Sequence, residues 1–284
     1  MSGTPESQKK RVVAYYEETT RASYLANWSG SALSFHFGLA DEETTSLDEA
    51  HLAANAFVAD ALGITNGTRV LDAGCGVGGT SIWLAQNRSA KVTGVTLEAG
   101  QVGLGTRFAE DRGVGDRVTL LVADYVATPF PPESFDVALN LESLCHCTAL
   151  GEYFEHIYER LAPGGRYGCL EFFVGEGRPD LVQEVMDTWA MPAWASMDTV
   201  ERALRGAGFA DVTATDMTSR VQLTAKQMHA MATNSLLVGK LQKAIDGEAR
   251  PIMEGHVRGA LACCEGLLNG GVTYGFVTGR KPPG

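Results

Sequence analysis

The sequence predicts an α/β fold in which a doubly wound, mostly parallel seven-stranded sheet follows an N-terminal helical segment. From about residue 68 to 174, short apolar and β-branched runs alternate with longer segments of helical periodicity. This alternation is typical of parallel strands joined by helices that cover both faces of a sheet. A glycine-rich turn, VLDAGCGVGGT at 70–80, includes the end of the first run. Because ligands of such sheets bind beyond the carboxyl ends of the strands, we expect the functional site at that edge.

Seven segments have the composition of strands, and helical patterns separate them. An apolar stripe at helical spacing runs from 153 to 161, and the APGG that follows at 162–165 should end this helix. Residues 196–209 predict another helix, with a polar start and a glycine exit. The expected strands are residues 68–74, 91–97, 117–125, 135–142, 166–174, 211–217 and 271–281.

Two regions fall outside this alternation. Residues 1–50 are rich in aromatic side chains and histidine, and we expect them to form an N-terminal helical cap. Residues 223–268 carry two helical patterns with apolar stripes that include several methionines. These stripes are either ordinary core-facing helix surfaces or a lid over an apolar pocket, because methionine adapts to irregular ligands. We expect the lid, inserted before the last strand.

The amino-acid composition limits the kinds of protein that this sequence can be. The 284 residues are 45% hydrophobic and 20% charged, enough for one large domain with its own core. Twenty-three basic against 34 acidic residues give a net charge of −11, which argues against nonspecific binding to nucleic acid. No apolar run approaches the roughly 20 residues that span a bilayer, so we expect a cytoplasmic protein without membrane insertion. The six cysteines form no CxxC pair, which predicts neither a disulfide framework nor a metal site.

The glycine turn contains an acid that discriminates between ligands. Gly74, Gly76 and Gly79 have the spacing of a dinucleotide-binding loop, and Asp72 stands just before them. A carboxylate is unfavourable beside a pyrophosphate. S-adenosylmethionine has no phosphate, and its ammonium and sulfonium groups are positively charged, so the acid has a use there. The turn therefore favours S-adenosylmethionine, although a glycine turn can also simply join a strand to a helix.

Together with VADY at 122–125 and LAPGG at 161–165, this turn resembles the Rossmann-like, or class I, S-adenosylmethionine-dependent methyltransferases. The resemblance covers roughly residues 30 to 280 and implies a methyltransferase domain over 51–284, with the lid at 223–268 inserted in it. It implies cofactor-binding roles for Asp72, Gly74, Gly76, Thr96, Leu97, Gln101, Asp124, Tyr125 and Leu141.

One difference from the usual family pattern indicates a particular branch of the family. The family usually has an acid near the end of the second strand for the ribose, whereas this chain has GVTLEAGQV at 94–102. That segment is similar to the sterol- and tocopherol-type branch, in which Gln101 would serve the ribose or methionine end. Glu98 is a rival for the ribose. By resemblance, Asp124 would accept the adenine amino group, and Tyr125 would line the ring pocket.

Candidate catalytic residues follow the fourth and fifth strands. LESLCHC at 141–147 contains Glu142 and His146, and CLEFF at 169–173 contains Glu171. A carboxyl group at the end of a buried apolar strand is costly without purpose or partner, and burial raises its pKa, which suits a general base. We therefore expect Glu171 to be catalytic. These two places also resemble the His and Asp pair of small-molecule O-methyltransferases of this fold, which implies a catalytic role for His146, with Glu171 at the second place. The alternatives are an ion pair between Glu171 and a lid cation, and a purely structural His146.

The flanking segments suggest the acceptor. Residues 15–38 and 255–282 resemble the corresponding parts of sterol methyltransferases and bacterial prenyl-diphosphate C-methyltransferases. The resemblance implies carbon methylation of an isoprenoid through a carbocation, with Glu171 as base and aromatic rings stabilising the cation. A diphosphate acceptor would also need Mg²⁺ or a cation such as Arg21, Arg178 or Lys226. The candidate substrate-binding residues are Tyr16, Trp28, His36, Phe172 and Trp189.

Other functions remain open at this point. An O- or N-methyltransferase of a secondary metabolite would keep the cofactor and use His146 as its base. A nicotinamide oxidoreductase is disfavoured by Asp72, and a methyltransferase-like scaffold would bind partners without turnover. All the enzymatic readings predict a small-molecule substrate, and none decides whether the chain forms a homo-oligomer.

Overall fold

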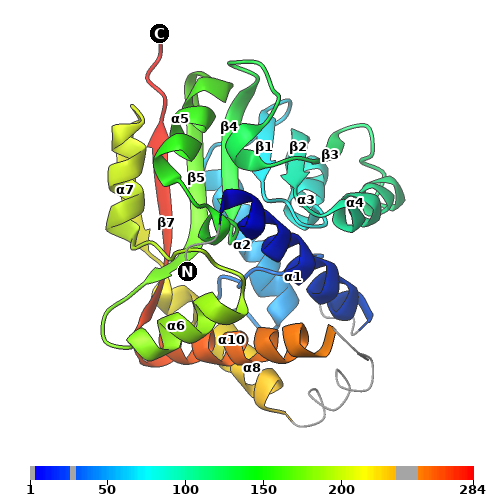
Figure 1. Ribbon diagram of the computed structural model, residues 1–284. Coiled ribbons are helices and arrows are strands. Elements are labelled where there is room, and N and C mark those ends of the chain that lie inside the picture. Colours follow the sequence, from blue (N-terminus) through cyan, green and yellow to red (C-terminus); the bar gives the residue numbers. More distant parts are fainter. Residues whose placement is uncertain (1–3, 26–29, 235–248) are drawn as a thin grey trace.

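The computed structural model describes residues 4–25, 30–234 and 249–284, whose strands form one seven-stranded sheet (Figure 1). The order is β3-β2-β1-β4-β5-β7-β6, with β7 antiparallel to both β5 and β6 and the other pairs parallel. The prediction of a mostly parallel, seven-stranded sheet is confirmed. The strands are β1 Arg69–Ala73, β2 Lys91–Thr96, β3 Val118–Val122, β4 Phe135–Leu141, β5 Leu161–Val174, β6 Ala210–Asp216 and β7 Val272–Arg280.

Several helices begin at recognisable sequence signals. Ser46 and Glu49 form a capping box at the start of α2, and the Ser196 side chain accepts from the Thr199 N–H at the start of α7. The helix at 179–188 was not anticipated from the sequence. The helices are α1 Pro5–Leu25, α2 Leu47–Ala61, α3 Gly79–Arg88, α4 Ala99–Asp111, α5 Leu150–Arg160, α6 Pro179–Thr188, α7 Met197–Gly206, α8 Gln222–Thr233 and α10 Ala249–Asn269, with short 3₁₀ turns η1 Tyr125–Ala127, η2 Leu144–His146 and η3 Thr218–Val221.

The core lies on both faces of the sheet because successive residues of a strand point to opposite sides. Val70 and Leu71 of β1 are both fully buried, but they belong to different hydrophobic clusters. The cluster around Leu71 packs under α5 and α7, and the cluster around Val70 packs under α2, α3 and the helices before β7. The near-continuous apolar runs of the central strands follow from this double coverage.

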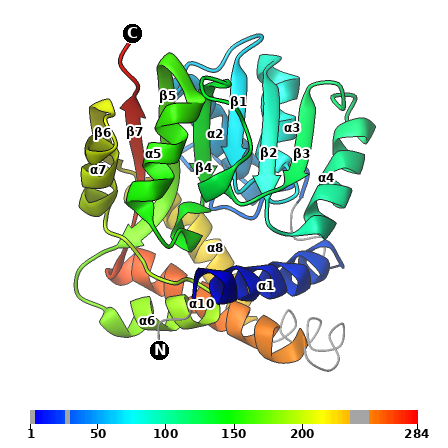
Figure 2. The ribbon, with the colours of Figure 1, turned by 45° about the horizontal axis from the view of Figure 1, so that its top comes forward.

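Helices α1, α6, α8 and α10 lie together at the carboxyl ends of the parallel strands (Figure 2). Helix α10 packs against α6, α8 and α1. The two helical patterns expected at 223–268 correspond to α8 and α10, and residues 235–248 between them, including Val238, Leu241 and Ile245 of the first stripe, lie outside the described residues. A role of this region as a lid remains a prediction.

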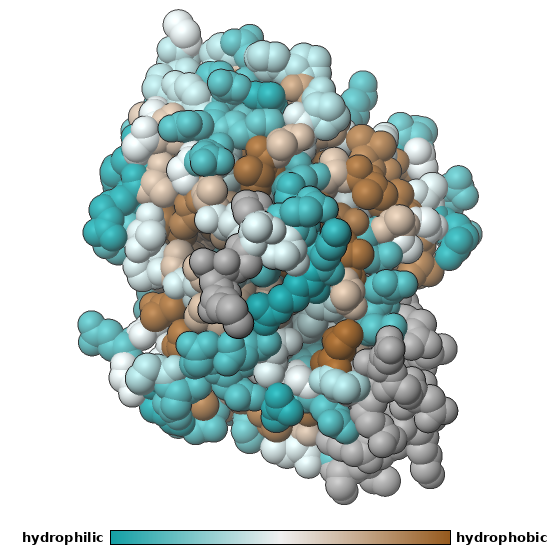
Figure 3. All heavy atoms as spheres, viewed as in Figure 1, coloured by the Kyte–Doolittle hydropathy of each residue, from teal (hydrophilic) through white to brown (hydrophobic). Residues whose placement is uncertain are grey.

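The N-terminal region consists of a helix and a following extended segment. Val12, Tyr15 and Thr19 of α1 are buried, whereas its opposite side forms a hydrophilic band across the surface (Figure 3). Residues 34–46 contain no helix and lead into α2, so the predicted boundary at residue 50 falls inside that helix. Among the described residues, no helix is both long and apolar enough to cross a bilayer.

Candidate active site

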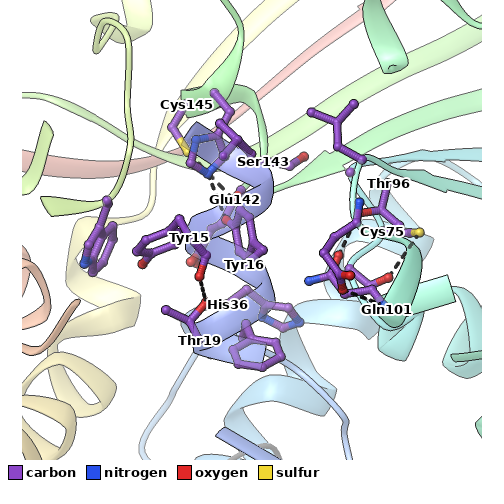
Figure 4. A pocket seen from close by; sticks show the side chains of 18 of the residues that line it. Tyr15, Tyr16, Thr19, His36, Cys75, Thr96, Gln101, Glu142, Ser143 and Cys145 are labelled. Atoms are coloured by element: carbon purple, nitrogen blue, oxygen red, sulfur yellow. Dashed lines mark hydrogen bonds between the residues drawn. The ribbon is translucent and has the colours of Figure 1, made fainter. Parts of the chain in front are cut away.

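A cavity opens between the carboxyl ends of the parallel strands and helices α1, α8 and α10. All the predicted site residues line it except Glu171, which lies behind the wall, and Trp28, which is outside the described residues. Figure 4 shows Cys75, Thr96 and Gln101 on one side, with Tyr15 and Glu142 on the other. The topology therefore brings residues far apart in the sequence to one place, and their individual roles remain predictions.

The glycine turn leaves room for a ligand at one position. Gly74 and Gly76 have φ of +90° and +55°, a region that favours glycine. A Cβ on Gly74 would lie 2.4 Å from the Cβ of Ser143, whereas a Cβ on Gly76 would meet no atom within 4 Å. Because Gly76 lines the cavity, a ligand can approach its backbone where any other residue would place a side chain.

Asp72 lies at the base of this turn and is almost fully buried. It is 2% exposed, and its Oδ2 accepts from the Ser81 hydroxyl at 2.6 Å. Burial raises the pKa of Asp72 to about 6, and the Ser81 hydrogen bond partly offsets this rise. A cationic group of a ligand would favour the ionised form further.

The end of β2 is tied to α1 through Gln101. The Thr96 hydroxyl donates to Gln101 Oε1 at 2.6 Å, and Gln101 Nε2 donates to the Thr20 hydroxyl at 3.0 Å. Glu98, the rival for the ribose, caps α4 instead, because its oxygens accept from the N–H groups of Gly100 and Gln101 at 2.6 and 2.7 Å. Both Gln101 and Glu98 still line the cavity.

Asp124, at the end of β3, has a partner on α1. Its Oδ1 accepts from the Val126 N–H at 3.0 Å, and its Oδ2 lies 2.6 Å from Lys9 Nζ. The neighbouring Tyr125 donates its hydroxyl to the Ser143 carbonyl at 3.1 Å. Helix α1 therefore contacts both the Asp124 and the Gln101 sides of the cavity.

These residues fit S-adenosylmethionine. The open backbone at Gly76, the buried acid Asp72 and the acid Asp124 suit a ligand that carries an ammonium, an adenine amino group and no phosphate. The same acids would repel the pyrophosphate of a dinucleotide, so the donor set disfavours a nicotinamide cofactor.

A buried network fixes the end of β4 against β1. Asn140 Oδ1 accepts from the hydroxyls of Tyr153 and Tyr167 at 2.5 and 2.8 Å. Asn140 Nδ2 donates to the Ala73 carbonyl at 2.7 Å and to the Ser143 hydroxyl oxygen at 2.9 Å. Because every polar group of Asn140 is satisfied, the turn that follows β4 has a defined position.

That turn places Glu142 on the cavity wall. Glu142 has φ of +47°, rare for a residue with a side chain. Its Oε1 accepts from the Phe37 N–H at 2.6 Å and from the Tyr274 hydroxyl at 2.7 Å. Burial raises the pKa of Glu142 well above its ordinary value, and the negative charge of Glu171 raises it further. No local sequence pattern predicts this left-handed backbone conformation, which sets the direction of the Glu142 side chain.

Glu171 lies behind the same wall. It is 2% exposed and is absent from the cavity lining. Its Oε2 accepts from the Cys145 N–H at 3.2 Å and its Oε1 from the Phe172 N–H at 3.0 Å, so it holds η2 rather than a lid cation. Burial raises the pKa of Glu171 to about 8. The expected rise in pKa is present, but a substrate in the cavity would meet Glu142 first.

Two adjacent tyrosines of α1 each bind a histidine. The Tyr16 hydroxyl lies 2.8 Å from His146 Nε2, and the Tyr15 hydroxyl lies 2.6 Å from His256 Nδ1 of α10. Burial lowers the pKa of His146 and of His256 to about 4, so both rings are neutral at pH 7. All four side chains line the cavity. His256 was missed by sequence reasoning because nothing in its local sequence marks it.

Aromatic rings and methionines form the remaining wall. The ring of Phe172 lies 5.6 Å from that of Trp189, which stacks on His256 at 6.1 Å. Met228 of α8 and Met253 of α10 also line the cavity. His36 lines it from the N-terminal segment, with Nδ1 bonded to the Phe37 carbonyl at 2.9 Å. This side of the cavity suits an apolar ligand.

Two of the three cations considered for a diphosphate, Arg178 and Lys226, lie away from the cavity. Arg178 pairs with Asp180 and Glu265 at 2.8 and 3.0 Å, and neither Arg178 nor Lys226 lines the cavity. The side chain of Arg21 lies outside the described residues.

A family model and curated relatives match this chain. Residues 70–165 match the family described as methyltransferase domain. The sterol 24-C-methyltransferase of Yarrowia lipolytica is 31% identical over 207 residues, which are 69% of this chain and 52% of that protein. The chain thus spans about half the length of the curated relatives that it matches.

Two solved structures share the fold over nearly the whole chain. The [4+2]-cyclase SpnF superposes with a TM-score of 0.78 at 24% identity, covering 96% of both chains. The geranyl diphosphate C-methyltransferase of Streptomyces coelicolor A3(2), in complex with Mg²⁺, geranyl diphosphate and S-adenosyl-L-homocysteine, superposes with a TM-score of 0.75 at 21% identity, covering 99% of this chain and 100% of that chain. At such identities the likeness concerns the fold, and reactions differ within a fold.

Proposed function

This chain belongs to the Rossmann-like, class I S-adenosylmethionine-dependent methyltransferases, and we propose that it methylates a carbon atom of an isoprenoid alkene. Its similarity to a sterol 24-C-methyltransferase supports an isoprenoid acceptor. One observation of the structure supports it most: the half-buried Glu142 lines a cavity whose wall includes the rings of Phe172 and Trp189. A carbocation needs a base of this kind and aromatic faces of this kind.

S-adenosylmethionine supplies an electrophilic methyl group on a positively charged sulfur. Asp72, Gly76 and Asp124 would hold and orient this donor, so that the acceptor carbon meets the methyl group in line. The π electrons of the alkene form the new carbon–carbon bond, and the carbon–sulfur bond breaks to leave a neutral thioether. Phe172 and Trp189 would stabilise the resulting carbocation.

Glu142 would then complete the reaction as the base. Its carboxylate takes the proton adjacent to the cationic carbon, and the electrons of that carbon–hydrogen bond form a new double bond. Sequence reasoning assigned this step to Glu171. The cavity geometry favours Glu142, with Glu171 behind it, holding the backbone of η2 in place.

Oxygen or nitrogen methylation with His146 as base is the second candidate. The Tyr16–His146 hydrogen bond is the arrangement such a reaction would use. The pKa of His146 is lowered to about 4, however, so its imidazole is a weak base at neutral pH. This observation favours carbon methylation.

The direct test is product chemistry. The protein is incubated with methyl-labelled S-adenosylmethionine and a panel of prenyl alcohols, prenyl diphosphates, sterols and phenols, and the labelled products are identified by mass spectrometry. A label on carbon supports the proposal. A label found on oxygen or nitrogen, or absent from every acceptor, would refute it.

Two matched variants then identify the base. Glu142→Gln keeps the size of the side chain and removes its basicity, so turnover should fall by about 10²-fold or more while donor binding persists. The cation should leak into rearranged or water-quenched products. Glu171→Gln should retain most of the activity. A larger loss of activity in Glu171→Gln than in Glu142→Gln would identify Glu171 as the base.

A further inference from the structure

We propose that the acceptor is an uncharged isoprenoid whose hydroxyl group is bound by the two Tyr–His pairs of the cavity, rather than a prenyl diphosphate. This inference rests on the proposed carbon methylation and specifies its substrate class. The charge of the cavity and the chemistry of the Tyr–His pairs support it separately.

Acidic side chains outnumber lysine and arginine among the described residues that line the cavity. Among its described lining residues, Lys9 is the only lysine or arginine, and its Nζ lies 2.6 Å from Asp124. A diphosphate is normally bound by arginine or lysine side chains, or through Mg²⁺. Here it would meet an excess of negative charge instead. The carboxylates that line the cavity are Asp72, Glu98, Asp124 and Glu142.

Hydrogen bonds already occupy one oxygen each of Asp72 and Glu142 and both oxygens of Glu98. Asp72 accepts from Ser81, Glu98 caps α4, and Glu142 accepts from the Phe37 N–H and the Tyr274 hydroxyl. Within the parts of the chain that the structure describes, no three histidine, cysteine, aspartate or glutamate side chains group so that they could hold a metal ion.

The two Tyr–His pairs of the cavity are neutral and lie close together. The rings of Tyr15 and Tyr16 are 5.0 Å apart, and each hydroxyl is bonded to a histidine from a different wall, His256 or His146. A tyrosine hydroxyl that donates to a neutral imidazole can still accept a hydrogen bond. A hydroxyl group of the acceptor can therefore join either pair without bringing a charge into the cavity.

Matched pairs of ligands test the charge of the acceptor. Binding of geraniol and geranyl diphosphate, of farnesol and farnesyl diphosphate, and of a Δ24 sterol and its 3-sulfate is measured by calorimetry with S-adenosylhomocysteine present. In each pair that binds, the uncharged member should bind at least 10-fold more tightly, and 5 mM Mg²⁺ should not reverse this order. A charged member that binds equally well or better, with or without Mg²⁺, would overturn the inference, as would failure of all six ligands to bind.

Tyrosine variants test the hydroxyl contact. Tyr15→Phe or Tyr16→Phe should reduce the preference for the bound alcohol over its methyl ether by about 3- to 10-fold, as expected for one lost hydrogen bond. Tyr158→Phe is the matched control, because Tyr158 does not line the cavity. An unchanged preference in both α1 variants would contradict the assignment of the head group to these pairs.

The two proposals can fail separately. An alcohol that binds tightly but receives no methyl group on carbon would refute the proposed reaction and leave the inference about charge intact. Carbon methylation of a tightly bound diphosphate would support the proposed reaction and refute the inference about charge.

Discussion

The Tyr274 hydroxyl of β7 donates to Oε1 of Glu142 at 2.7 Å, and thereby connects the last strand of the chain to the carboxyl group proposed as the base. The backbone N–H of Phe37 donates to the same oxygen at 2.6 Å. These two donors, which come from opposite ends of the sequence, fix the carboxyl group and partly offset the rise in its pKa that burial causes.

Tyr274→Phe should therefore shift the pH dependence of methyl transfer. The hydroxyl stabilises the ionised form of Glu142, so its loss raises the pKa of Glu142 and moves the acidic limb of the rate profile to higher pH. At pH 7 the rate should fall by roughly 10-fold, and it should recover at alkaline pH. The measurement is a kcat/KM profile for the identified acceptor. A uniform loss at every pH would indicate a structural role instead.

A second prediction concerns donor binding at the glycine turn. Gly76→Ala places a methyl group in the open space where the donor backbone contact is expected, so binding of S-adenosylhomocysteine should weaken by about 10-fold or more. Calorimetry measures this change.

Gly113→Ala controls for backbone strain in that experiment. Gly113 also has a positive φ, of +70°, and an open surrounding, but it does not line the cavity. Both substitutions should lower the melting temperature to a similar extent, and only Gly76→Ala should affect the donor. Equal donor binding in the two variants would show that the turn does not contact the donor.

A third prediction concerns Lys9, which pairs with Asp124 at the expected adenine site. If the adenine amino group binds Asp124, it must share this carboxylate with Lys9, so Lys9→Met should tighten binding of S-adenosylhomocysteine by about 2- to 5-fold, a modest gain because the pair is partly exposed. Lys10→Met, an exposed neighbour on the same helix, should have no effect.

Asp124→Ala should act in the opposite direction and weaken the donor by about 10-fold. Weaker binding in Lys9→Met would mean that Lys9 itself holds the donor. The salt dependence offers a second readout, because added salt screens the Lys9–Asp124 pair.

The sheet and the donor side of the site could be predicted because their signals are local. Strand periodicity, the positive-φ glycines and the acid at the end of β1 all lie within a few residues of one another. The topology of parallel sheets then places the ends of neighbouring strands side by side, which explains why Asp72, Thr96 and Asp124 line one cavity.

The acceptor side could be predicted only in part because its signals are not local. The choice between Glu142 and Glu171 depends on a left-handed backbone at Glu142 and on donors from Phe37 and Tyr274. No periodicity reports such contacts. The partnership of Tyr15 with His256 joins positions 241 residues apart, and only the packing of α1 against α10 reveals it.

The raised pKa of Glu171 should make the stability of the folded protein depend on pH. Burial raises its pKa from an ordinary 4.5 to about 8, so the folded protein holds a proton that the unfolded chain releases at lower pH. Its contribution to stability is therefore fully present below about pH 4.5 and is lost as the pH rises toward 8. Glu171→Gln resembles the protonated side chain at every pH and should remove this part of the dependence.

Thermal unfolding from pH 5 to 8 measures the effect. The melting temperature of Glu171→Gln should exceed that of the parent by a margin that grows with pH, because the parent alone loses stability over this range. Glu155→Gln, at an exposed position on α5, should track the parent throughout. Since both Glu171 oxygens accept backbone hydrogen bonds, Glu171→Ala should be less stable than Glu171→Gln at every pH. If the difference in melting temperature between Glu171→Gln and the parent stayed constant or shrank with pH, Glu171 would be ionised in the folded protein. That outcome would contradict a raised pKa for Glu171.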